Sequence, residues 1–179
     1  MYRLPLLLLL VTAFSAGCSN NGGLSTTEPM YADLDEVVAR GSVSPVAGVT
    51  SAGQPDAAAL GVFARSGYAA VIDMRTAGED RGLDEPAVVG QLGMEYVTFP
   101  VGSGDITLDK ARELDGLLAQ YDEPVLLHCG SGNRVGALLA LSEYLKTGDR
   151  EQALQKGRDA GLTGLEGRVV EVIEGSAAH

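Results

Sequence analysis

One short run of this sequence combines residue types that could carry out chemistry. The run His128-Cys129-Gly130-Ser131-Gly132-Asn133-Arg134 follows an apolar stretch at 124–127 and leads into a helical pattern. Small residues between a strand and a helix let backbone N–H groups converge, and with the helix N-terminus they form a site for an anion. Arg134 can bind two oxygens of that anion through its planar guanidinium. The same positive field favours the thiolate of Cys129, which is the nucleophilic form of cysteine.

The same residues also have structural interpretations. A cysteine at the end of a buried strand is commonly a small apolar residue, and glycine-rich turns after strands are frequent. The combination of His-Cys, two glycines and an arginine is much rarer, so we expect a functional role for Cys129 and Arg134. His128 could tune the thiol or satisfy a hydrogen bond beneath the loop, and we favour the second interpretation.

The composition restricts what this loop can bind. The chain of 179 residues has 24 acidic and 13 basic side chains, which gives a formal net charge of −11. An acidic surface repels phosphate backbones, so we expect no nucleic-acid partner, and a bound anion must be held by a local device. Two histidines and two cysteines are too few for a conventional zinc site or a disulfide scaffold. No metal or organic cofactor is implied, because the Cys129 thiol, the backbone N–H groups and Arg134 suffice for the chemistry.

The N-terminal segment has the pattern of an export signal. Arg3 precedes a short apolar stretch, and small residues lead directly into Cys18, as in bacterial lipoprotein signals. We expect residues 1–17 to be a signal peptide, Cys18 to be lipidated, and residues 18–30 to form a flexible tether. The protein would then lie on the periplasmic face of a bacterial membrane, attached only by its lipid. A soluble secreted or periplasmic product is the alternative, because Ser15 stands where a larger aliphatic residue is usual.

The remaining residues, 31–179, alternate apolar runs with helical patterns. The runs 68–72, 94–101 and 124–127 predict strands, and a Glu/Asp-rich loop follows the first of them. Helices are predicted at 54–67 and 85–92, from Thr107, and from the glycine loop through Leu145; Asp149 and Thr163 begin two more. Alternating strands and helices predict a single α/β domain, with a mostly parallel central sheet flanked by helices and a helical C-terminal end.

The loop at 128–134 resembles the signature loop of Cys-dependent phosphatases. The chain is similar to the bacterial β-lactamase-hydrolase-like phosphatase domain family, which is related to tyrosine and dual-specificity phosphatases. Segments 51–55, 71–75, 93–96 with 100–101, and 157–163 agree with that family in their order. The resemblance implies hydrolysis of phosphate monoesters, on a small molecule or a protein, through a phosphocysteine formed on Cys129. It also implies that Arg134 and the amides of Gly130, Ser131, Gly132 and Asn133 hold the phosphate oxygens.

The resemblance further implies a general acid on the loop before the helix that precedes the cysteine strand. Asp105 occupies that loop, in the run Gly-Ser-Gly-Asp. Its alternative role is that of a negative charge near the start of the helix at Thr107. Asp73 is the weaker candidate, since we expect it to pair with Arg75 or a neighbouring loop.

Two features of the loop leave other functions open. Four residues separate Cys129 from Arg134, one fewer than in tyrosine and dual-specificity phosphatases, and Val135 stands where those enzymes usually carry a hydroxyl. The shorter spacing resembles that of rhodanese-like sulfurtransferases, whose cysteine carries a persulfide. Those domains usually have a Gly-His-Ile segment before the cysteine loop, whereas this sequence has no histidine before His128. A domain that binds an anion or a partner without turnover is the third possibility.

Overall fold

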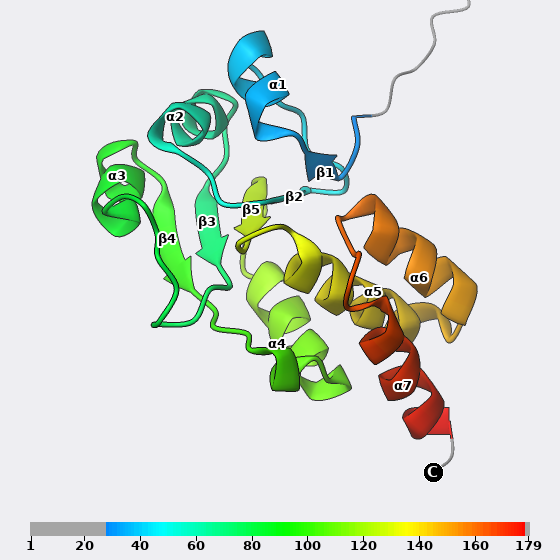
Figure 1. Ribbon diagram of the computed structural model, residues 1–179. Helices are drawn as coiled ribbons and strands as arrows, with labels where there is room; N and C mark the ends of the chain where they lie inside the picture. The colour runs from blue at the N-terminus through cyan, green and yellow to red at the C-terminus, as the bar shows by residue number, and fades with distance from the viewer. Residues whose placement is uncertain (1–27, 178–179) are drawn as a thin grey trace, which may run out of the picture.

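The computed structural model of this protein describes residues 28–177 (Figure 1). The expected signal peptide, Cys18 and most of the expected tether lie outside these residues. Every helix within 28–177 is too short or too polar to span a membrane.

Five parallel strands form the central sheet. In spatial order they are β1 (Tyr31–Ala32), β2 (Val49–Ala52), β5 (Val125–His128), β3 (Ala70–Asp73) and β4 (Glu95–Thr98). The last strand in sequence is thus the central one, and it pairs with β2 and β3. His128 lies opposite both Ala52 and Asp73, so three strands reach the carboxyl edge at the same level. The predicted parallel α/β sheet is confirmed.

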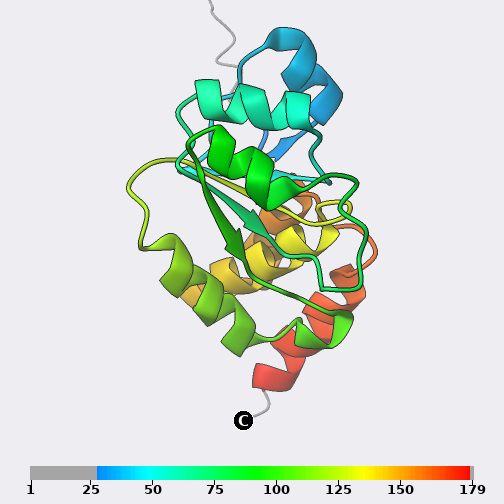
Figure 2. The same cartoon turned by 90° about the vertical axis from the view of Figure 1, so that its left-hand side faces the viewer.

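The helices cover the two faces of the sheet in two groups (Figures 1 and 2). One face carries α1 (Leu34–Arg40), α2 (Ala57–Arg65) and α3 (Glu85–Gln91), and the other carries α4 (Leu108–Leu118), α5 (Asn133–Thr147), α6 (Arg150–Asp159) and α7 (Glu166–Ala177). Crossovers between parallel strands are right-handed. The chain moves across the sheet in one direction from β1 to β4 and returns to β5, so α4 must change face. The predicted helical C-terminal end packs on that second face.

Side chains of β5 alternate between the two resulting cores. Val125, Leu127 and Cys129 belong to the core beneath α4 and α5, whereas Leu126 belongs to the core beneath α2. Successive side chains of a strand point to opposite faces. The neighbours His128 and Cys129 therefore point to opposite faces of the sheet.

The boundaries of the elements differ from the predictions in ways that local chemistry explains. The predicted strand 94–101 ends at Thr98, just before Phe99-Pro100, where proline has no N–H for the ladder. The helix predicted from residue 54 begins at Ala57, because Asp56 caps it by accepting a hydrogen bond from Ala59 N. Strands β1 and β2 and helix α1 were not predicted, since β1 has two residues and β2 contains Thr50-Ser51.

Candidate active site

The loop after β5 lies at the carboxyl edge of the central strand, where open α/β sheets bind ligands. Cys129 is buried at the end of β5, and α5 begins at Asn133. Gly132 caps α5 with φ of 81°, and a Cβ there would lie 2.4 Å from Cε2 of Tyr31. Both the conformation and the close contact require glycine. Ser131 pairs with Gly53 after β2, and its carbonyl accepts a hydrogen bond from the Tyr31 hydroxyl at 3.5 Å. The loop is thus fixed from the β1–β2 side.

Arg134 lies in the first turn of α5 and is held by several acceptors. Its Nη1 donates to Glu79 Oε1 at 2.6 Å, to Val101 O at 3.0 Å and to Met74 O at 3.4 Å. Its Nη2 donates to Glu79 Oε2 at 2.5 Å. Glu79, and secondarily Cys129, raises the pKa of Arg134 above its already high usual value. The structure therefore brings the two principal predicted residues, Cys129 and Arg134, to one place.

Glu79 is the acidic residue of this site that sequence reasoning missed. It lies in the loop after β3, and its side chain is 33% exposed. The hydrogen bonds from Arg134 lower the pKa of Glu79 to about 2. The partial burial of this carboxylate acts in the opposite direction, and hydrogen bonds from Thr76 also lower the pKa. The sequence offered only the acidic character of that loop, because 55 positions separate Glu79 from Arg134.

A pocket of about 390 Å³ opens beside the loop. Its lining consists of Thr76, Glu79, Gly102, Ser131, Asn133, Arg134 and Leu165. The side chain of Asn133 faces the C-terminal segment, where its Oδ1 accepts hydrogen bonds from Thr163 N at 2.8 Å and Leu165 N at 3.3 Å. Asn133 therefore anchors the entrance to α7, and only its backbone is placed for an anion at the helix N-terminus.

Asp105 lies next to this pocket but does not line it. Its exposed carboxylate ends the short 3₁₀ turn Ser103–Asp105, and its Oδ2 accepts a hydrogen bond from Gly102 N at 2.8 Å. Gly102 itself lines the pocket. The acid role of Asp105 therefore stays a prediction, and it requires the side chain to leave Gly102 N.

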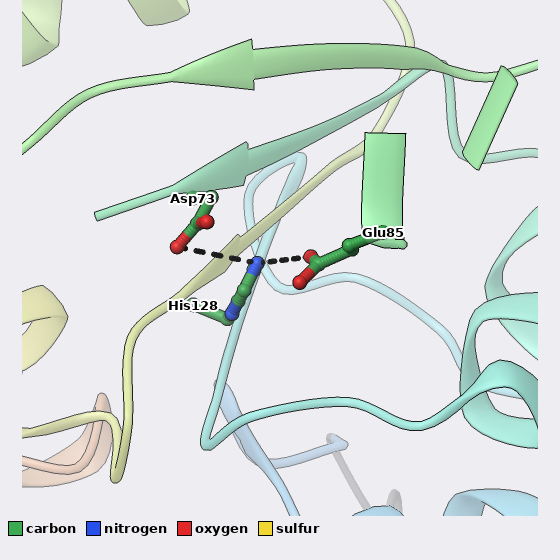
Figure 3. A group of neighbouring side chains, drawn as sticks. All are labelled: Asp73, Glu85 and His128. Atoms are coloured by element: carbon green, nitrogen blue, oxygen red, sulfur yellow. Dashed lines mark ion pairs between the residues drawn. The ribbon is translucent and has the colours of Figure 1, made fainter. Parts of the chain in front are cut away.

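A buried charged cluster lies under the carboxyl edge, on the face opposite Cys129 (Figure 3). Arg75 donates to Asp73 Oδ1 through Nε at 2.8 Å, and its Nη2 bonds both Asp73 and Glu85. His128 Nε2 lies 2.7 Å from Glu85 Oε1 and 3.9 Å from Asp73 Oδ1. The first separation is short, but the two atoms are not aligned for a hydrogen bond. The expected pairing of Asp73 with Arg75 is present.

The cluster continues through Asp73 to two residues nearer the surface. Asp73 Oδ2 accepts hydrogen bonds from the Tyr96 hydroxyl at 2.7 Å and from Arg81 Nε at 3.0 Å. Burial by itself would raise the pKa of Asp73, but hydrogen bonds from Arg75 and Tyr96 outweigh burial and lower it well below its usual range. Asp73 is therefore ionised at neutral pH and is not available as a proton donor.

Ligand atoms of Asp73, Glu85 and His128 lie within 4.8 Å of one another, which is close enough for a shared metal ion. The donors already bound to Asp73 argue against its serving as a metal ligand. The two oxygens of Asp73 accept from the backbone and side chain of Arg75, from Arg81 and from Tyr96. The guanidinium charges also balance the carboxylates, and a divalent ion would add uncompensated charge to a buried site. We interpret the group as a buried ion-pair network.

Comparison with known proteins agrees with this fold. A family model described as "Beta-lactamase hydrolase-like protein, phosphatase-like domain" matches residues 42–146. A curated beta-lactamase hydrolase-like protein from Agrobacterium fabrum is 33% identical over 101 residues, which are 54% of this chain and 23% of the relative. The chain thus spans less than a quarter of that relative's length.

Two solved structures show the same fold at low sequence identity. A putative phosphatase from Neisseria meningitidis has a TM-score of 0.58 at 20% identity, covering 67% of this chain and 89% of its own. Kinase-associated phosphatase, with its catalytic cysteine replaced by serine, has a TM-score of 0.51 at 21% identity, covering 70% and 79%. With the family model matching more than half of its residues, this chain belongs to the β-lactamase hydrolase-like phosphatase domain family.

Proposed function

We propose that this domain hydrolyses phosphate monoesters through a phosphocysteine on Cys129. The observation that carries the proposal is the placement of Cys129 at the carboxyl end of the central strand and of Arg134 in the first turn of the following helix, where it lines a pocket. The phosphatase-like fold and family support it. The substrate is a phosphorylated small molecule or a phosphorylated protein.

The reaction proceeds in two balanced steps. The Cys129 thiolate attacks phosphorus, the bond from phosphorus to the ester oxygen breaks, and a carboxylic acid protonates the departing alkoxide. Water then attacks phosphorus, gives a proton to the same carboxylate, and releases phosphate and the thiolate. The N–H groups at the start of α5 and the guanidinium of Arg134 stabilise the charge on the equatorial oxygens in both steps.

Asp105 is the proposed acid because the other nearby carboxylates are unsuited. A general acid has to be protonated near the working pH. The ion pair with Arg134 keeps the pKa of Glu79 near 2, and Asp73 is buried and held ionised by Arg75 and Tyr96. Asp105 is exposed, lies on the loop that borders the pocket, and accepts one backbone hydrogen bond.

Substitution of the nucleophile tests the proposal. With p-nitrophenyl phosphate under reducing conditions, Cys129→Ser should abolish turnover, and Arg134→Lys should reduce it severely because an ammonium cannot bind two oxygens. Ser131→Ala is the matched control, since Ser131 is on the same loop and its hydrogen bond from the Tyr31 hydroxyl uses the backbone carbonyl. Turnover that survives Cys129→Ser would eliminate the mechanism.

Sulfur transfer is the second candidate, favoured by the four-residue spacing between Cys129 and Arg134. Thiocyanate formation from thiosulfate and cyanide measures it in parallel. Thiocyanate formation without phosphate release would contradict phosphate hydrolysis and support sulfur transfer. A protein inactive in both assays would instead be a module that binds an anion or a partner.

We also propose that the domain is exported and anchored through a lipid on Cys18. The support is the sequence pattern at 3–18, which lies outside the described residues. The full chain should partition with membranes, and Cys18→Ser should release it to the soluble periplasmic fraction. Membrane association that persists in the variant would contradict the lipid anchor.

A further inference from the structure

A pocket of about 630 Å³ lies at the amino edge of the sheet, at the end opposite the Cys129 loop. Its lining includes Val49, the first residue of β2, and Glu123, which lies just before β5. Helices α4, α5 and α6 supply much of the remaining wall (Figure 1). Part of that wall is apolar, since Met30 and Leu139 belong to the core beneath α4 and α5. Cavities of this size with apolar walls and a few polar groups are typical ligand sites.

A second pocket, of about 290 Å³, adjoins the first one. The two pockets share Met30, Val46 and Lys156, and we call them together the amino-edge pockets. Val46 is partly buried and packs against the core. The remaining lining of the smaller pocket consists of Glu28, Pro29 and Asp159. The Lys156 side chain therefore lies where two partly apolar pockets meet.

Lys156 is unusual among the basic residues of this protein. Within residues 28–177, every lysine and arginine except Arg65 and Lys156 forms an ion pair with a carboxylate. Acidic residues outnumber basic ones by 24 to 13, so an unpaired base is uncommon here, whereas an unpaired acid is expected. Arg65 is exposed, but Lys156 is half-buried. The Lys156 side chain has thus lost part of its hydration without gaining an acceptor, which a ligand could supply.

The charged residues around Lys156 differ from it in having partners of their own. These pairs are Glu28 with Arg40 at 2.6 Å, Asp159 with Gln155 at 2.8 Å, Lys146 with Asp115 at 3.0 Å, and Glu143 with Gln152 at 2.6 Å. Asp122 and Glu123 are exposed acids on the loop that borders the larger pocket. Their negative charge disfavours a ligand that carries two negative charges more than a ligand that carries one.

The turn that carries Val46 is a strained part of the wall. Val46 and Val49 exchange two backbone hydrogen bonds, at 3.2 and 3.1 Å, around Ala47 and Gly48. Ala47 has φ of 52°, and within residues 28–177 no other residue apart from glycines has a positive φ. Strained backbone of this kind is concentrated at ligand sites and active sites.

We propose that the amino-edge pockets bind an amphiphile of the fatty-acid class, with one carboxylate head and one apolar tail. The carboxylate accepts a charge-assisted hydrogen bond from the Lys156 ammonium, which supplies the partner that this group lacks. The tail lies along Met30, Val46 and Leu139 and is removed from water there. This site is distinct from the Cys129 loop, so the proposal does not rest on phosphatase activity.

Binding of laurate to the full-length protein, followed by methyl NMR, tests the proposal. The methyl groups of Met30, Val46 and Leu139 report on this site alone, and their shifts give the affinity. We expect Lys156→Gln to weaken laurate binding by roughly tenfold, because a charge-assisted hydrogen bond is lost. Lys156→Arg, which keeps the charge, should bind laurate nearly as wild type does.

Two further variants separate charge from space. Arg65→Gln removes the other unpaired cation, which lies outside the amino-edge pockets, and should leave laurate affinity unchanged. Ala119 is an exposed residue of the larger pocket's lining. Ala119→Trp should therefore block laurate binding by filling the pocket, although it alters no charge.

Two further ligands test the head and the tail separately. Acetate has the carboxylate alone and should not shift the three methyl groups, whereas dodecylamine has a similar tail with the opposite charge and should bind wild type more weakly than laurate. Equal laurate affinity in wild type and Lys156→Gln, or dodecylamine that binds wild type as tightly as laurate, would contradict the carboxylate head. Laurate that leaves the methyl groups of Met30, Val46 and Leu139 unshifted would overturn the site itself.

Discussion

If Asp105 is the general acid, its carboxyl group has to leave its present hydrogen-bond partner and donate a proton to the leaving group. It accepts from Gly102 N in the structure, yet it must reach the leaving oxygen. We expect Asp105→Asn to slow hydrolysis of phenyl phosphate by about 100-fold, and that of p-nitrophenyl phosphate much less, because nitrophenolate leaves without a proton. Steady-state kinetics with both esters measure the difference.

Asp109→Asn is the control for Asp105→Asn. Asp109 is an exposed acid in the first turn of α4, where it pairs with Arg112. It should not distinguish the two esters. An equal loss of rate on both esters in Asp105→Asn would remove Asp105 from the acid role and leave it as a capping charge.

Burial decides how much an arginine contributes to stability in this protein. Arg75 is 1% exposed and binds two buried carboxylates, whereas Arg112 forms an exposed pair with Asp109. We expect Arg75→Met to lower the free energy of unfolding by about 3–5 kcal/mol, because Asp73 and Glu85 would be left buried without their partner. Arg112→Met should cost about 1 kcal/mol or less. Urea denaturation measures both, and similar losses would contradict the importance of the buried network.

The Glu79–Arg134 pair should make stability depend on pH in a defined window. The pKa of Glu79 is lowered from 4.5 to about 2, so the folded state binds the proton less readily than the unfolded state. The pair therefore stabilises the fold above pH 4.5, and its contribution is lost as the pH falls toward 2. We expect the free energy of unfolding of wild type to exceed that of Glu79→Gln by about 1 kcal/mol at pH 6. The difference is small because water screens a partly exposed pair.

Urea denaturation of both proteins between pH 6 and the acid limit tests this window. The difference in unfolding free energy between wild type and Glu79→Gln should shrink with falling pH. A difference that stays constant with pH would show that the pair does not couple to folding.

Among the elements, α5 bears most on the site, because its N-terminus follows the Cys129 loop and α6 packs closely against it. A Cβ on Gly136 of α5 would lie 2.3 Å from Leu162 N and 2.7 Å from Gly157 O, both backbone atoms that cannot move independently. We expect Gly136→Ala to lower the free energy of unfolding by about 2 kcal/mol or more through overpacking.

Gly116 in α4 is the matched glycine for this test. A Cβ there meets no atom within 4 Å, so Gly116→Ala should raise the free energy of unfolding by about 0.5–1 kcal/mol through helix propensity alone. Thermal and urea denaturation compare the two variants. Stabilisation by Gly136→Ala would mean that α5 and α6 pack less closely than the structure shows.

The elements also show where sequence reasoning succeeds and where it stops. The apolar run before His128, the glycines after Cys129 and the capping residue Thr107 act within one or two turns of the chain, so β5, α5 and α4 were predictable. Glu79 and Glu85 reach their partners only through the sheet topology. Nothing in their local spacing pairs them with Arg134 or His128, which is why the ion pairs under the loop were not predicted.

At the scale of the whole molecule, the candidate anion site works against the protein's own field. The net charge is −11, and a neighbouring pocket of about 330 Å³ is lined by Asp33, Asp35 and Asp56 together with Tyr31 and Gln54. Glu79 also balances the charge of Arg134, so the site has little net positive charge to attract an anion from a distance. Repulsion thus acts at long range and attraction only at contact.

This difference in range predicts the response to salt. Ions screen interactions beyond the Debye length, about 10 Å at 0.1 M, more than those inside the pocket. Raising the ionic strength from about 0.01 to 0.1 M should therefore increase kcat/KM for the p-nitrophenyl phosphate dianion by roughly two- to threefold. Alkylation of Cys129 by neutral iodoacetamide is the control and should not change. A fall in kcat/KM over that range would mean that local positive charge, and not the acidic surface, governs the approach of the substrate.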